Sequence, residues 1–272
     1  MHGFIPPHRF LPYLSWTDVR DLPDKANAVV LQPIGSIEQH GPHLPAIVDS
    51  AIATAVIGKA LGILDESIPA YALPTVYYGK SNEHDRFPGT LTLSAQTLQA
   101  MLMEVGESLY RSGFRKWAIA NAHGGQPQVL EIVARDLHQQ YPDFVVLPLF
   151  IWNVPNCAAE LLSAKELELG IHAGDAETSL MLAIAPDLVR MDKAIAEYPR
   201  QLPSESLLSM EGKLPFAWTT RDLSRSGVLG DATVATREKG DRIWESLASG
   251  WARAIADIYR FQQPRAWQED EA

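Results

Sequence analysis

The chain has 272 residues, of which 46% are hydrophobic and 21% charged, so its composition is that of a globular protein with a full core. The formal net charge of −10 argues against nucleic-acid binding, because phosphate contacts require clustered lysine and arginine side chains. The single cysteine excludes an internal disulfide, and residues 1–8 do not resemble a signal peptide. No apolar run approaches the roughly 20 residues that span a bilayer. We therefore expect a cytoplasmic protein without a membrane segment.

Strand and helix patterns alternate along the chain. The expected strands cover residues 26–34, 71–78, 117–121 and 144–150. The expected helices cover residues 50–60, 94–113, 127–140 and a segment from about 175. Asp49 or Ser50 is expected to cap the first of these helices, and Ser94 and Gly113 to bound the second. This alternation predicts one α/β domain over residues 1–272 with a largely parallel sheet and a polar tail from about residue 262.

The segment that follows the first expected strand is rich in possible metal ligands. Glu38 and His40 are two residues apart, so their side chains point the same way in an extended chain. A glycine and two prolines then bend the chain and allow Asp49 to return. Carboxylate and imidazole groups together are ligands for zinc, manganese or iron. A solvated surface loop is the plain alternative.

Two later segments carry further candidate ligands. His123 follows the strand at 117–121 and precedes Gly124 and Gly125, which would let a metal or substrate approach closely; an ordinary strand-to-helix turn is the alternative. His172 and Glu177 lie near the start of a helix and can face one pocket, with Glu177 as ligand or catalytic carboxylate. The Glu38 and His123 loops both leave strand ends, where open α/β sheets bind ligands.

Other segments predict contacts to a small-molecule substrate. The loop at 81–91 could close over the site with His84 as a substrate contact, and Trp152 could cover a small planar ligand. A glycine-rich stretch at 226–233 lacks the Walker lysine, and no GxSxG motif is present, so nucleophilic catalysis by a side chain is disfavoured. A pair of metals bridged by Asp49 and a hydroxide fits better. The five candidate ligands are Glu38, His40, Asp49, His123 and Glu177.

These motifs, in this order, resemble those of the creatininase (creatinine amidohydrolase) family. The matching segments are residues 35–45, 48–49, 87–90, 121–125, 172–179 and 227–231. The resemblance implies a three-layer α/β/α fold, a homohexamer and a dinuclear site with zinc plus zinc, manganese or iron. It makes Glu38 and His123 ligands of one metal, His40 a ligand of the other and Asp49 the bridge. It further implies that a metal-bridging hydroxide hydrolyses a small, often cyclic amide, with His172 assisting proton transfer.

One departure bears on the substrate. Family members that open creatinine carry a bulky aromatic residue and a metal-binding glutamate where Gly124 and Gly125 stand here, so Glu177 is expected to complete the second metal site and creatinine is disfavoured. Formamide hydrolysis and the trimming of a precursor peptide, which other branches perform, remain open. So do a structural homologue without turnover and a dinuclear phosphoesterase, although only Lys80 and Arg86 lie near a candidate pocket loop to neutralise a phosphate.

Overall fold

The computed structural model describes residues 2–203, 205–212 and 214–264. A four-stranded sheet forms its centre, with every neighbouring pair parallel and the strands in the order β2-β1-β3-β4. The strands are β1 (Val29–Ile34), β2 (Ala70–Ala72), β3 (Lys116–Asn121) and β4 (Val145–Phe150). β1 and β3 are buried on both faces, which explains why their sequences read as continuous apolar runs.

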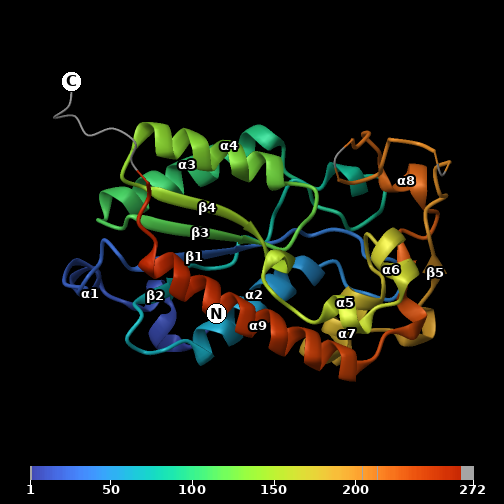
Figure 1. The fold of residues 1–272 in the computed structure, drawn as a ribbon, viewed down its shortest axis with the longest axis horizontal. Coiled ribbons are helices and arrows are strands. Elements are labelled where there is room, and N and C mark those ends of the chain that lie inside the picture. The colour runs from blue at the N-terminus through green and yellow to red at the C-terminus, as the bar shows by residue number, and fades with distance from the viewer. Residues whose placement is uncertain (1, 204, 213, 265–272) are drawn as a thin grey trace.

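Helices cover both faces of this sheet (Figure 1). α3 (Ala95–Arg111) and α4 (Pro127–Gln140) pack on one face over an apolar core around Trp117 and Phe114. α2 (Val48–Ile63) and α9 (Arg237–Arg260) pack on the other face over a second core that contains Trp251. The structure therefore confirms the expected three-layer α/β/α fold with a parallel sheet.

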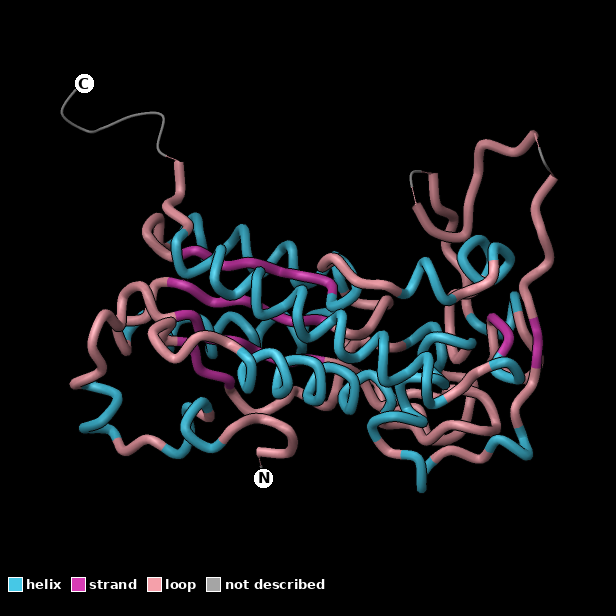
Figure 2. Tube along the Cα trace, turned by 60° about the horizontal axis from the view of Figure 1, so that its bottom comes forward, coloured by secondary structure: helices cyan, strands magenta, loops and turns pink. Residues whose placement is uncertain are grey.

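The remaining elements are short. They are α1 (Trp16–Arg20), α5 (Ala158–Leu161), α6 (Ala164–Leu169), α7 (Asp175–Ile184), α8 (Thr220–Leu223), β5 (Ala196–Glu197) and β6 (Gly230–Asp231). Most of them lie beyond the end of the sheet toward which the strand arrows point (Figure 1). Figure 2 shows long loops around β5 and β6 at this end. Among the described residues, no helix is long and apolar enough to cross a membrane.

The start of α2 differs from the expectation. The helix begins at Val48, so neither Asp49 nor Ser50 caps it, and Asp49 lies in its first turn instead. Gly35 presses against this turn so closely that a Cβ at position 35 would lie 2.4 Å from the backbone nitrogen of Ser50. The Ser50 hydroxyl donates to the carbonyl of Ser36. Side chains that could have capped the helix are thus turned to contacts with the segment after β1.

The second strand is also shorter than expected. The pattern at 71–78 predicts a strand, but β2 ends at Ala72. Pro74 has no N–H group to donate and interrupts the ladder, and pairing resumes only as an isolated bridge between Val76 and Ile34. The expected boundaries of the 94–113 helix are confirmed, since the Ser94 side chain caps α3 and Gly113 has φ +94°. Of the predicted tail, residues 265–272 lie outside the described residues.

Candidate metal centre

Two loops that leave the centre of the sheet form the base of the site. Ile34 at the end of β1 pairs in register with Asn121 at the end of β3, so the loops that carry Glu38 and His123 begin side by side. The Asn121 side chain holds the second loop, because it accepts from the backbone N–H of His123 and donates to the carbonyl of the same residue. The site lies at the carboxyl ends of the strands, as expected for an open α/β sheet.

Asp49 lies between two histidines. Its Oδ1 is 3.2 Å from His40 Nε2 and its Oδ2 is 3.2 Å from His123 Nδ1. The Ser36 hydroxyl donates to Oδ2 at 2.5 Å and orients the carboxylate. Glu38 adds a second carboxylate, with Oε2 at 3.1 Å from His123 Nδ1. A carboxylate with one oxygen directed at each of two imidazoles has the geometry of a bridging ligand.

A further carboxylate completes the His40 side. Glu177 lies in the first turn of α7, and its Oε2 is 3.9 Å from His40 Nε2. The backbone N–H of Ala173 donates to the same oxygen at 2.6 Å, from a residue with φ +54°. His40 Nε2 is fully buried and has no hydrogen-bond partner among the described residues. An unpartnered buried nitrogen that faces carboxylates is suited to a cation.

The outer contacts of three histidines select which ring nitrogen faces the site. His40 Nδ1 lies 3.2 Å from the carbonyl of Glu38, and His123 Nε2 lies 2.9 Å from the carbonyl of Lys80. His172 Nε2 lies 2.7 Å from the carbonyl of Gln39. Because a carbonyl can only accept, each of these nitrogens carries a proton, and the opposite nitrogen is the one available to bind a cation. Metal-binding histidines have this arrangement.

The electrostatics of the site also favour a cation. Burial raises the pKa of Glu177 to about 7, with the negative charge of Asp49 adding to the effect and His40 opposing it. Burial lowers the pKa of His40, but the carboxylates of Asp49, Glu177 and Glu38 together outweigh this and the pKa rises to about 9. A divalent cation would replace the proton on His40 and offset the crowded negative charge.

The donor set can therefore hold metal. Three groups of side chains bring ligand atoms close enough to one another to bind a cation: Glu38 with His40 and His172, Glu38 with Glu83 and His123, and His40 with Asp49 and Glu177. All five side chains expected as ligands thus lie together. Sequence reasoning missed Glu83, which no ligand spacing in the chain indicates.

His84, expected to contact substrate, lies beside Glu38 with Nε2 at 3.4 Å from Oε1. The Gln39 amide nitrogen lies 2.8 Å from His84 Nδ1, and the Gln39 oxygen accepts from the N–H of Gly41, which fixes the orientation of the amide. His84 Nδ1 therefore accepts, and its Nε2–H points toward Glu38. Gln39 was also missed, since a lone glutamine carries no pattern in the sequence.

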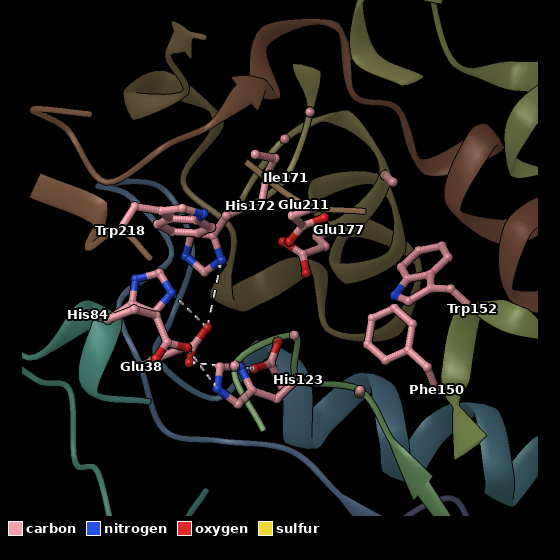
Figure 3. A pocket seen from close by; sticks show the side chains of 18 of the residues that line it. Glu38, His84, His123, Phe150, Trp152, Ile171, His172, Glu177, Glu211 and Trp218 are labelled. Carbon is pink, nitrogen blue, oxygen red and sulfur yellow. Dashed lines mark ion pairs between the residues drawn. The ribbon is translucent and has the colours of Figure 1, made fainter. Parts of the chain in front are cut away.

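A cavity of 660 Å³ opens over the ligands. Figure 3 shows Phe150 and Trp152 on one side and Trp218 on the other, with His84, His123 and His172 all directed at Glu38. Gly124, Gly125 and Trp152 line the cavity as expected of substrate-binding residues. Glu211 and Trp218 also line it and were not expected, because the segment at 201–219 has no apolar period that would place it.

Comparison with known proteins gives consistent matches over most of the chain. The family model described as "Creatinine amidohydrolase" matches residues 12–255. The mycofactocin precursor peptide peptidase of Mycolicibacterium smegmatis is 33% identical over 248 residues, which cover 89% of this chain and 86% of the relative. The creatinine amidohydrolase of Pseudomonas putida is 30% identical over 264 residues, or 92% and 97% of the two chains. A solved structure described as "Creatininase Mn" superposes with a TM-score of 0.74 at 29% identity and covers 92% of this chain and 98% of its own.

Proposed function

Since the chain belongs to the creatininase family of metal-dependent amidohydrolases, we propose that it hydrolyses the C–N bond of a small cyclic amide or formamide at a site with two divalent cations. The observation that carries the proposal is the Asp49 carboxylate, which directs one oxygen at His40 and the other at His123. Zinc with zinc, manganese or iron suits this set of nitrogen and oxygen ligands.

In this proposal Glu38 and His123 would hold one cation, His40 and Glu177 would hold the other, and Asp49 would be a ligand of both. When bound, the cation pair supplies an activated water near neutral pH and polarises the carbonyl of the substrate. The chain then has to orient the substrate and move protons. The substrate would lie in the cavity between Trp152 and Trp218, over Gly124 and Gly125, with the His84 Nε2–H as a donor.

His172 is the proposed proton carrier. Its Nε2–H is held by the carbonyl of Gln39, while Nδ1 faces the site at 3.7 Å from Glu38 Oε1. Burial, together with the neighbouring His40 and His84 imidazoles, keeps the pKa of His172 well below its usual value. The ring is therefore neutral, and Nδ1 can accept a proton and return it to the leaving nitrogen.

A short peptide is the second candidate substrate. A relative at 33% identity is named a precursor peptide peptidase. The cavity of 660 Å³ lies in the range that encloses drug-sized ligands, so a small amide would leave part of it empty. An amide bond near the end of a peptide would present the same carbonyl to the cations.

Phosphoester hydrolysis is disfavoured by the charge of the cavity. Among the described residues that line it, Lys80 is the only lysine or arginine. The lining carboxylates are Glu38, Asp49, Glu83, Glu166, Glu177 and Glu211. A phosphate dianion would be repelled by this surface once the cations are neutralised by their ligands.

Metal content per chain tests the proposal. We expect about two metal ions per chain by plasma mass spectrometry on untagged protein, and none in Asp49→Ala, because that change removes the shared ligand. Asp187→Ala, an exposed aspartate outside the cavity, is the matched control and should keep both ions. Absence of metal from the wild-type chain, even after reconstitution, would favour a structural homologue without turnover.

Activity assays then separate the substrate classes. Cyclic amides, formamides, creatinine, short peptides and an aryl phosphate should be compared at equal metal loading. Hydrolysis of the amides supports the first candidate, and release of an amino acid from peptides alone supports the second. We also propose that the protein is cytoplasmic and forms a homo-oligomer, which would be a hexamer by family resemblance. Sedimentation analysis would test the number of subunits.

A further inference from the structure

His123 has a charged partner on each side of its ring. Nδ1 faces Glu38 Oε2 at 3.1 Å and Asp49 Oδ2 at 3.2 Å. On the opposite side Nε2 lies 2.9 Å from the carbonyl of Lys80 and 3.2 Å from Glu83 Oε1. The ring is almost completely buried, with 2% of its side-chain surface exposed, so no solvent shell competes for these contacts.

Glu83 reaches this position from a separate segment of the chain. It belongs to the 3-10 turn Asn82–His84, and only 14% of its side-chain surface is exposed. Lys80, at the start of the same segment, contributes the carbonyl described above, and its Nζ donates to the carbonyl of Gly125 at 3.4 Å. The segment at 80–83 therefore contacts the His123 loop through three separate groups.

The glycine at position 125 makes room for the Glu83 carboxylate. A Cβ built on Gly125 would lie 1.7 Å from Glu83 Oε1 and 2.6 Å from His123 Nε2. A Cβ built on the adjacent Gly124 would have no heavy atom within 4 Å. Of two neighbouring glycines, one borders open cavity and the other borders a carboxylate, so their roles differ.

We propose that Glu83 is a positioning residue of the metal centre. Its carboxylate accepts a hydrogen bond from the Nε2–H of His123, in the space left by the missing side chain of Gly125. This contact orients His123 Nδ1 toward the cation that His123 and Glu38 would bind together. The proposal depends on the dinuclear site proposed above. A carboxylate behind a ligating imidazole fixes its tautomer and makes the opposite nitrogen a stronger donor, and loss of such a partner typically lowers metal affinity 10–100-fold. The Lys80 carbonyl alone is uncharged and would supply only the orientation.

The first test changes the charge of Glu83. We expect Glu83→Gln to lower the affinity for one of the two zinc ions about 10-fold or more and to leave the affinity for the other unchanged. Chelator competition measures both affinities. Asp85→Asn removes the same charge from an exposed residue two positions away and should bind both ions as the wild type does. Unchanged affinity at both sites of Glu83→Gln would overturn the proposal. Complete loss of one ion at millimolar zinc would also overturn it, because Glu83 would then be a direct ligand.

The second test displaces the carboxylate without changing its charge. Gly125→Ala should weaken binding of the same zinc ion as Glu83→Gln, because the new methyl group would lie 1.7 Å from Glu83 Oε1 and 2.6 Å from His123 Nε2 and so force the two apart. Gly124→Ala is the matched control and should keep full affinity for zinc, because a Cβ at this position would have no heavy atom within 4 Å. The double variant Gly125→Ala/Glu83→Gln should be no weaker than the weaker single variant, since both changes remove one interaction. Additive losses would contradict a shared mechanism.

A spectroscopic readout separates positioning from a general effect on stability. Histidine-selective ¹⁵N spectra of the zinc-loaded chain should show His123 protonated at Nε2, and the Nε2–H proton should exchange faster in Glu83→Gln but not in Asp85→Asn. A proton on Nδ1 of His123 would overturn the proposal. If the wild-type chain binds no zinc, the dinuclear proposal fails by itself, and the exchange of the Nε2–H proton in the metal-free chain, which should still be faster in Glu83→Gln than in Asp85→Asn, tests the contact between Glu83 and His123 on its own.

Discussion

The base of the cavity and its outer wall are built in different ways. The base consists of Glu38, His40, Asp49 and His123, each with at most 2% of its surface exposed, and all four are held near the ends of β1 and β3. The wall consists of Phe216 and Trp218, which come from the segment at 201–219, where Leu207 is 82% exposed. In this wall the Trp218 indole donates to the carbonyl of Met210, within the same segment. From this comparison we infer that, in the proposed reaction, the base would carry the chemistry and the wall would select the substrate.

The largest expected effect concerns His172, which lies beside the base. His172→Ala should lower kcat 10²–10⁴-fold with metal content unchanged, because the substitution removes a general acid–base but none of the proposed ligands. Metal analysis and kinetics on the same preparation check this result. His172 Nδ1 lies 3.7 Å from Glu38 Oε1, so loss of one metal from the variant would instead identify His172 as a ligand.

An intermediate effect is expected for the wall. Trp218→Ala should raise KM about 10-fold and change kcat by less than about twofold, because it removes apolar contact to the bound substrate worth roughly 1.4 kcal/mol. Steady-state kinetics on the accepted amide measure both constants. Leu207→Ala, at an exposed position of the same segment outside the cavity lining, is the control. A fall in kcat with unchanged KM would place Trp218 with the base.

The smallest effect concerns the loop after α8, which follows the wall in the chain. Glu197 accepts from Ser224, from the N–H of Arg225 and from Ser226, and although partial burial opposes the shift, these hydrogen bonds lower its pKa to about 2. Glu197→Gln should lower Tm by about 2–4 °C at neutral pH, measured by calorimetry.

The pH dependence of that difference follows from the sign of the pKa shift. The pKa of Glu197 is lower in the folded chain than its usual 4.5, so its stabilisation is complete above about pH 5 and is lost as the pH falls toward 2. The Tm difference between wild type and Glu197→Gln should shrink over this range. A difference that stays constant down to pH 2 would exclude the ionised carboxylate as its cause.

Sequence patterns predicted the base better than the wall for a physical reason. The apolar runs of β1 and β3 can be buried only in a central sheet, and loops that leave such strands meet at one edge, so Glu38 and His123 could be placed together. Glu83 could not be placed, because its contact with His123 depends on the path of an irregular loop. Trp218 lies in a segment without apolar period, so no local pattern indicated that it would return over the cavity.

The pairing of Ile34 with Asn121 has a consequence for how the protein folds. These residues belong to strands far apart in the chain, and the loops that carry Glu38 and His123 become neighbours only after β1 and β3 have paired. A shared cation therefore cannot bind before this long-range pairing has formed. Metal binding would then stabilise the completed sheet rather than an early folding intermediate, and would slow unfolding more than it speeds refolding.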